Sequence, residues 1–248
     1  MAVGVDTEEL LELFFATTNP GKLRELRRLV AGLSIRVVSP DDLGRLPPEV
    51  EEDGATFQAN AEKKASACAR FSGLHALADD SGLCVDALGG APGVLSARWS
   101  ELEPGPAPAS PVCDLAEAAA AELGPIAGRA ARDERNNDKL LAALAGLPPA
   151  RRGAEYVAVL SLARPDGWIL ESVTGRCRGR IAEARRGSGG FGYDPLFVPD
   201  AEQRAGGART MAELAPDEKD ALSHRGEAFA RLRPVLARVR LDVREAKG

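Results

Sequence analysis

Apolar and polar positions alternate along the chain in a way that predicts short strands and helices. Residues 13–16 form an apolar run that ends at a polar stretch, residues 17–22, as a buried strand followed by a loop would. Leucines at 23, 26 and 29 then recur at helical spacing. We therefore predict a strand, a polar loop and a helix, preceded by a loose leader over residues 1–10.

A second helix is predicted from residue 57, where Phe57, Ala61, Ala65 and Cys68 lie on one stripe and Gly73 supplies the stop. Residues 74–78 follow as an apolar strand, which we expect to end at the polar sequence Asp79-Asp80-Ser81-Gly82. A further short strand is possible over residues 83–88.

The second half of the chain continues the mixture of strands and helices. Residues 101–132 are rich in proline and alanine, and we predict a surface insertion there, with at most a short helix over 114–123 because the prolines are too frequent for a continuous one. Strands over 156–163 and 168–175 flank the turn sequence Arg-Pro-Asp-Gly. Helices follow over 211–222 and from Ser223 onward, where Pro234 should kink or divide the last one.

This alternation predicts an α/β fold with a mixed β-sheet and flanking helices, and the 248 residues, 44% of them hydrophobic, suffice for one domain or for two lobes that share a core. A net charge of −5 repels polyanions, which argues against a nucleic-acid-binding module. The four cysteines form no CxxC pair, so we expect reduced thiols. An acidic start and the absence of an apolar stretch of ~20 residues predict a cytoplasmic protein without a membrane span.

A candidate phosphate-binding loop lies between the first strand and the first helix. Backbone N–H groups at a helix N-terminus favour an anion, and this loop adds neutral donors and one lysine. Its residues are Thr17, Thr18, Asn19, Pro20, Gly21 and Lys22. The spacing is not that of a P-loop, so an ordinary Asn-Pro-Gly turn remains an alternative.

Two acidic clusters are candidates for a magnesium site: Glu51-Glu52-Asp53 and Asp79-Asp80. Carboxylate oxygens suit Mg²⁺, which commonly neutralises charge in phosphoryl transfer. Neighbouring residues on a strand point to opposite faces, so we expect one aspartate to serve the site while the other braces the loop. A solvated acidic run is the alternative reading, above all for residues 51–53.

Basic and aromatic residues supply the remaining candidates. Lys64 lies near the apolar stripe of its helix, where it either reaches water or points toward an anion. Ser223 is a plausible N-cap that places His224 and Arg225 in the first turn, with Lys219 shortly before. The glycine-rich segment Phe191-Gly192-Tyr193-Asp194 could stack a base, although its aromatics could equally pack on the core.

Taken in order, these segments resemble the inosine triphosphate pyrophosphatase family, also called the Ham1 family. The matching stretches span Phe15 to Ala228 and include FATTNPGKLRELRRL, EEDGATFQANAEKKA, ALADDSGLCVDALGGAPGVLSARW, NNDKLLAAL, GRIAEARRGSGGFGYDPLF and TMAELAPDEKDALSHRGEA. The long block around Asp79-Asp80 and the paired FGYDP and SHR motifs are the most specific. Thr18 departs from a frequent glycine and Trp99 from a usual tyrosine.

The resemblance implies an elongated two-lobed α/β fold, usually a homodimer, that hydrolyses the deaminated purine nucleotides ITP, dITP and XTP to monophosphate and pyrophosphate and so cleanses the nucleotide pool. It implies that Asp80 is the general base and a Mg²⁺ ligand, with Glu51, or second Glu52, as the other ligand. Substrate contacts would come from Thr17, Thr18, Asn19, Pro20, Gly21, Lys22, Lys64, Ser81, Phe191, Gly192, Tyr193, Asp194, Lys219, His224 and Arg225.

Two other functions remain open at this stage. A related pyrophosphatase acting on other modified nucleotides would carry the same acidic and basic residues. A catalytically silent nucleotide sensor is disfavoured because Glu51, Asp80 and Lys22 are all present, whereas a sensor could dispense with the base.

Overall fold

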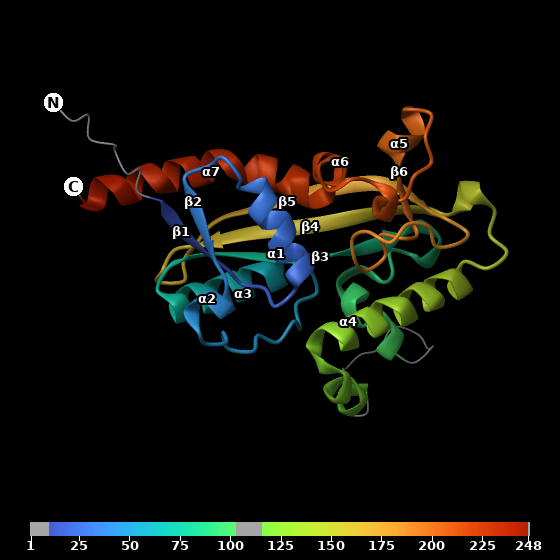
Figure 1. The fold of residues 1–248 in the computed structure, drawn as a ribbon, viewed down its shortest axis with the longest axis horizontal. Helices are drawn as coiled ribbons and strands as arrows, with labels where there is room; N and C mark the ends of the chain where they lie inside the picture. The colour runs from blue at the N-terminus through green and yellow to red at the C-terminus, as the bar shows by residue number, and fades with distance from the viewer. Residues whose placement is uncertain (1–9, 103–115, 248) are drawn as a thin grey trace. The chain divides into compact units, whose positions relative to one another are not determined.

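The structure, a computed structural model, describes residues 10–102 and 116–247 (Figure 1). A single mixed sheet has the strand order β2-β1-β3-β4-β5-β6. Strand β1 pairs in parallel with β2 and β3, and β5 pairs antiparallel with β6. The strands are β1 (Leu11–Phe15), β2 (Ile35–Val38), β3 (His75–Val85), β4 (Gly153–Ala163), β5 (Ile169–Ile181) and β6 (Phe197–Pro199). The predicted α/β class is confirmed.

The chain divides into two compact units, and β3, β4 and β5 each contribute residues to both. Unit 1 comprises residues 10–80, 158–176 and 223–247 among those described, and unit 2 comprises 81–157 and 177–222 with the same gap at 103–115. The predicted leader and the start of the predicted insertion lie outside the described residues.

The described residues of unit 1 include the N-terminal strands and four helices. Its helices are α1 (Pro20–Leu29), α2 (Pro40–Leu43), α3 (Phe57–Ser72) and α7 (His224–Lys247). On β1, Leu13 and Phe15 pack in a core with α1 and α7, whereas Phe14 packs in a second core with α3. Alternation along one buried strand therefore places helices on both faces of the sheet, as Figure 1 shows for α7 and α3.

Unit 2 is built around a separate core in which Leu83, Leu140 and Phe197 are fully buried. Its helices are η1 (Asp86–Leu88), η2 (Gly93–Glu101), α4 (Ala116–Ala143), η3 (Pro149–Arg151), α5 (Asp200–Arg204), η4 (Met211–Glu213) and α6 (Pro216–Leu222). Within the described parts of both units, no helix has the length and apolar character of a membrane span.

Four expectations from the sequence are wrong in detail. Strand β3 does not end at Asp79 but runs on to Val85. It pairs with β1 over residues 75–77 and has β4 as its other neighbour, so its place in the sheet overrides the turn preference of an Asp-Asp-Ser-Gly sequence. Helix α4 continues through Pro125 to Ala143. The predicted helix over 211–222 is two short helices, η4 and α6, and α7 continues through Pro234 without being divided.

Gly175 fixes how closely β5 and α7 approach each other in unit 1. A Cβ atom at this position would lie 2.1 Å from the carbonyl oxygen of His224 and 2.4 Å from the amide nitrogen of Ala228. These are backbone atoms, which cannot rotate aside as a side chain can. Glycine is therefore required for the first turn of α7 to lie where it does.

Candidate active site

Asn19 organises the predicted phosphate loop at the start of α1. Its side-chain oxygen accepts hydrogen bonds from the backbone N–H of Gly21 (2.9 Å) and of Lys22 (3.4 Å), and its own N–H donates to the Thr17 hydroxyl (3.1 Å). The Asn19 cap thus already uses N–H groups that we expected to be open to an anion, so this part of the prediction is corrected. The Lys22 ammonium is the positive group that the loop presents.

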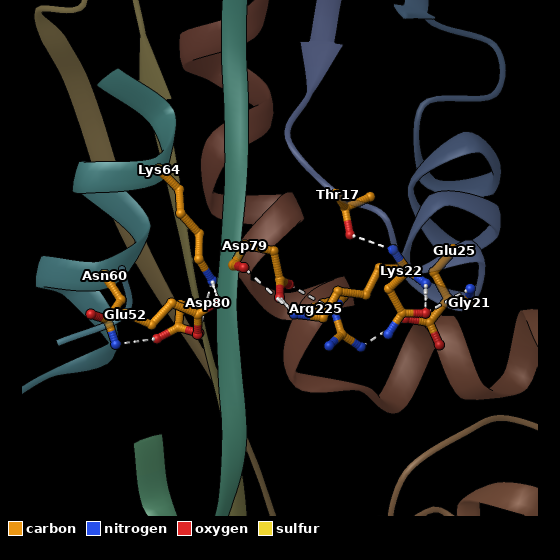
Figure 2. Close-up of polar contacts among 11 residues, drawn as sticks. Thr17, Gly21, Lys22, Glu25, Glu52, Asn60, Lys64, Asp79, Asp80 and Arg225 are labelled. Atoms are coloured by element: carbon orange, nitrogen blue, oxygen red, sulfur yellow. Dashed lines mark hydrogen bonds and ion pairs between the residues drawn. The ribbon is translucent and has the colours of Figure 1, made fainter. Parts of the chain in front are cut away.

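Asp79 joins Lys22 to Arg225 of α7, two residues far apart in the sequence (Figure 2). One carboxylate oxygen of Asp79 accepts a hydrogen bond from the Lys22 ammonium, and the other accepts one from the Arg225 Nε at 2.7 Å. Arg225 also donates to Glu25 of α1 at 2.8 Å. These contacts give a buried network of two cations and two carboxylates, in which Asp79 bridges the cations.

The charges of this network stabilise one another against the cost of burial. Burial alone would raise the pKa of Asp79, but Arg225 and Lys22 outweigh it, and the pKa lies far below its usual range. For Arg225 burial is likewise the largest effect and would lower the pKa, yet Asp79 and Glu25 raise it. The pKa of Lys22 is lowered, chiefly by burial. Asp79 is therefore held as a carboxylate in the folded protein.

Asp80, the next residue on β3, points to the other side of the strand, as Figure 2 shows. Its carboxylate accepts a hydrogen bond from the Asn60 amide of α3 at 3.1 Å and lies 3.4 Å from the Lys64 ammonium. Burial raises the pKa of Asp80, with Lys64 acting against it. The predicted division of the two aspartates between opposite faces is confirmed, and Lys64 points to Asp80.

Glu52 belongs to the same cluster as Asp80. The Lys64 ammonium lies 2.8 Å from the Glu52 carboxylate, so a single cation bridges Glu52 and Asp80. For Lys64, burial would lower the pKa, but Asp80 and Glu52 together raise it. Glu51, our first choice as metal ligand, is exposed, which makes Glu52 the better placed of the two.

The carboxylates of Glu52 and Asp80 are suited to binding one small divalent cation together. Two carboxylates that share one ammonium are close enough to share a metal ion, and their oxygens are hard donors. No group of three or more potential ligands occurs among the residues that the structure describes. Mg²⁺ is usually held by one or two carboxylates together with substrate phosphates and water, so two are sufficient.

Unit 2 contains the second group of predicted residues. The Asp194 carboxylate accepts hydrogen bonds from the Lys219 ammonium (2.6 Å), from the Phe191 backbone N–H (2.9 Å) and from the Tyr156 hydroxyl (3.4 Å). The Lys219 ammonium also lies 4.8 Å from the centre of the Phe191 ring. Phe191, Asp194 and Lys219 therefore form one cluster.

Tyr193 has a different position from the one expected. Its ring is buried in the core of unit 2, and its hydroxyl donates to the Ser96 carbonyl at 2.9 Å. The alternative that an aromatic of this segment packs on the core is thus correct for Tyr193. Phe191, by contrast, is half-buried.

The remaining predicted residues lie beside these clusters. Ser223 caps α7, since its hydroxyl accepts a hydrogen bond from the Gly226 N–H at 3.0 Å, and His224 is buried in the first turn. Ser81 follows Asp80 on β3. Within the described residues of unit 1, Asp79 joins Lys22 to Arg225 on one side of β3, and Lys64 contacts Asp80 on the other. In unit 2, Phe191, Asp194 and Lys219 lie together.

Several residues of these clusters escaped the sequence analysis. Asn60 lies on the stripe that α3 buries, four residues before Lys64, and a polar residue on an apolar stripe was a usable signal. Glu25, three residues after Lys22 on α1, carried no signal beyond helical spacing. Asp133 and Asn137 of α4 bind Gly192. Both follow the predicted insertion, and Asn137 lies in the matching stretch NNDKLLAAL, but neither was named as a site residue.

Comparison with known proteins identifies similar sequences. A protein named dITP/XTP pyrophosphatase from Anaeromyxobacter sp. (strain Fw109-5) is 75% identical over 229 residues, which cover 92% of this chain and 98% of the relative. Another of the same name, from Streptomyces avermitilis, is 43% identical over 92% of this chain and 98% of its own.

Solved structures give the same result. A HAM1 protein from Coxiella burnetii superposes with a TM-score of 0.69 at 35% identity, covering 92% of this chain and all of its own (100%). The Ham1 protein of Staphylococcus aureus gives 0.66 at 31% identity, over 91% of this chain and 98% of its own. The sequence model of the Ham1 family matches residues 13–121 and 117–235. The chain belongs to the Ham1 family.

Proposed function

We propose that this protein hydrolyses the deaminated purine nucleotides dITP, XTP and ITP to the monophosphate and pyrophosphate. The observation that carries the proposal is the division of Asp79 and Asp80, which places a carboxylate bound by two cations on one side of β3 and a second buried carboxylate beside Lys64 on the other. The name dITP/XTP pyrophosphatase of relatives up to 76% identical supports the substrate class.

Asp80 is the general base in this proposal. It accepts a proton from the attacking water as the oxygen bonds to the α-phosphorus and the bond to pyrophosphate breaks. Asn60 and Lys64 each contact one of its oxygens, so the carboxylate is fixed in orientation before substrate binds. Asp79 is unsuited to the role because two cations, Lys22 and Arg225, bind it and hold its pKa far below its usual range, which makes its carboxylate a weak base.

Lys22 and Lys64 carry the positive charge that the triphosphate needs. An ammonium has three donors, so Lys22 can remain bound to Asp79 and still donate to a phosphate oxygen. Asp79 holds Lys22 in place, and Lys22 in turn stabilises the negative charge that develops on the leaving pyrophosphate.

Mg²⁺ is part of the proposal. Asp80 and Glu52, or Glu51 in its place, would hold the ion, which supplies neutralisation of phosphate charge when bound. The Lys64 ammonium that now bridges Glu52 and Asp80 would then be released toward the substrate phosphates.

Base recognition is assigned to the cluster of unit 2. The ring of Phe191 offers a face for stacking, and Lys219 offers N–H donors to a 6-keto oxygen. Adenine carries a 6-amino group there, which would leave the donors unpaired, and such a mismatch lowers kcat/KM by factors of roughly 10⁴.

The test is pyrophosphate release measured with ITP, dITP, XTP, GTP and ATP, each with and without Mg²⁺. We expect turnover of the first three with Mg²⁺ and little with GTP or ATP. Equal turnover of GTP and ITP would remove the assignment, and a preference for another modified nucleotide would favour the related pyrophosphatase. Tight nucleotide binding without any turnover would identify a sensor.

Homodimer formation and a cytoplasmic location remain predictions from the resemblance and the composition. Light scattering after size-exclusion chromatography measures the first: a mass near twice the 26.1 kDa of one chain is expected.

A further inference from the structure

The segment Phe191–Asp194 is held from outside by helix α4. The Gly192 N–H donates to the Asp133 carboxylate at 2.9 Å, and the Gly192 carbonyl accepts a hydrogen bond from the Asn137 amide at 2.9 Å. Asp133 and Asn137 are four residues apart and so lie on one face of α4. Both polar groups of a single glycine are thus bound by one helix.

The two contacts from α4 matter because the backbone of this segment contains glycines that are free to adopt several conformations. Gly192 has φ +63°, and Gly190 has φ +72°, so the backbone on both sides of Phe191 is in the region that favours glycine. A Cβ at Gly190 would lie 2.1 Å from the Asp194 carboxylate, which shows how closely that carboxylate is folded back on the segment. Two glycines with a left-handed backbone, Gly190 and Gly192, therefore flank the ring that would stack a base.

Helix α4 contacts this segment at Gly192, whereas the neighbouring residues of the segment have other partners. Asp194 is held by Lys219 and Tyr156, and Tyr193 by Ser96. The Lys219 ammonium lies 4.8 Å from the centre of the Phe191 ring. The N–H and the carbonyl of Gly192 are therefore fixed by Asp133 and Asn137, while the Phe191 carbonyl accepts a hydrogen bond from the Asp194 N–H at 3.3 Å.

Asp133 and Asn137 both bury polar groups at a cost in folding free energy that packing alone does not explain. Asn137 is almost fully buried, and its side-chain oxygen has no hydrogen-bond partner among the described residues. Burial, the largest effect, raises the pKa of Asp133, and the hydrogen bond from Gly192 opposes it. Unsatisfied or desolvated polar groups of this kind are destabilising and mark sites where another requirement dominates.

We propose that Asp133 and Asn137 are positioning residues that set the substrate selectivity of the protein by fixing the Gly192 peptide, and with it the Phe191 ring. This rests on the proposed function, since it concerns recognition of the base by the same segment. Neither residue needs to touch the substrate.

Two substitutions of nearly equal size separate this role from general packing. Asp133→Asn keeps an oxygen that can accept from the Gly192 N–H, whereas Asn137→Asp replaces the donor to the Gly192 carbonyl with a second acceptor. Asn136→Ala is the matched control, because Asn136 is equally buried but bonds to Ser96, Ala97 and Ser100 instead.

The measurement is kcat and KM for dITP and dGTP, together with the thermal midpoint of each variant. For Asn137→Asp we expect KM for dITP to rise about tenfold, the equivalent of one hydrogen bond, with kcat changed far less, and the preference for dITP over dGTP to fall several-fold. Asp133→Asn should keep the preference. Asn136→Ala should lower the thermal midpoint and leave the preference unchanged.

The two proposals fail in different ways. If the wild-type protein turns over neither dITP nor XTP, the proposed function is wrong. If the wild-type protein prefers dITP and Asn137→Asp retains that preference, or if Asn136→Ala loses it to the same degree, the positioning role of α4 is wrong. Should Asn137→Asp not fold, Asn137→Ala, which removes the donor without adding an acceptor, decides by the same ratio.

Discussion

Asp79 and Asp80 are consecutive residues of β3 that serve different partners: Asp79 binds Lys22 and Arg225, whereas Asp80 binds Asn60 and Lys64. The two carboxylates have the same chemistry, and the direction of the side chain alone separates them. Their pKa values accordingly move apart, that of Asp79 downward and that of Asp80 upward. Substitution of each should therefore have a different effect.

Asp80→Asn should abolish most activity while leaving the fold intact. The amide keeps the shape and its single oxygen can still accept from Asn60 or from Lys64, but it cannot take a proton, so we expect kcat for dITP to fall by roughly 10²–10⁴. The thermal midpoint should change little. Asp53→Asn, an acidic residue paired with Lys63 at the surface, is the control that should retain full activity; near-normal turnover by Asp80→Asn would refute its role as the base.

Asp79→Asn should act on stability. It removes the carboxylate that bridges two buried cations, and breaking a buried ion pair costs roughly 3–5 kcal/mol. We expect the free energy of unfolding in urea to fall by about that amount. Asp53→Asn, with its solvated partner, should leave it nearly unchanged. Equal stability of the two variants would mean that the network contributes nothing net.

The pH dependence of unfolding follows from the same carboxylate. Because the folded pKa of Asp79 lies below its unfolded value of about 3.9, its contribution to stability is present above that pH and is lost as pH falls further. The difference in unfolding free energy between wild type and Asp79→Asn should be constant from pH 8 to about pH 5. It should shrink below about pH 4, and a constant difference down to pH 3 would contradict the assignment.

Asn60→Asp should shift the pH at which the enzyme works. A second carboxylate beside Asp80 disfavours the charged form of both, so the acid limb of the pH–rate profile should move upward by about one unit or more. The control is Gln58→Glu, which places the same charge on the exposed face of α3. An unshifted acid limb in Asn60→Asp would show that Asn60 does not govern the protonation of Asp80.

The sequence was most informative where local rules decide the outcome. Strand alternation predicted the opposite directions of Asp79 and Asp80, and the N-cap preference of serine predicted the start of α7 at Ser223. Local rules failed where distant residues decide. The sheet pairs β3 through a turn-like sequence, and core packing buries Tyr193.

Contacts between residues far apart in the chain had no signal in the sequence. Asp79 and Arg225 are 146 positions apart, and Asn137 and Gly192 are 55 apart. No periodicity connects such pairs, since each depends on the final arrangement of the elements that carry them. Motif resemblance could name Arg225 and Gly192 as site residues, but not the side chains that hold them.

Gly175 makes the geometry of the proposed nucleotide site depend on a position that carries no functional group. Arg225 belongs to the same turn of α7 that rests on Gly175, so a single added methyl group would lift the helix start and carry the guanidinium away from Asp79. A substitution of Gly175 on β5 would then lower activity without changing any proposed catalytic or binding side chain, because it displaces the helix that carries Arg225.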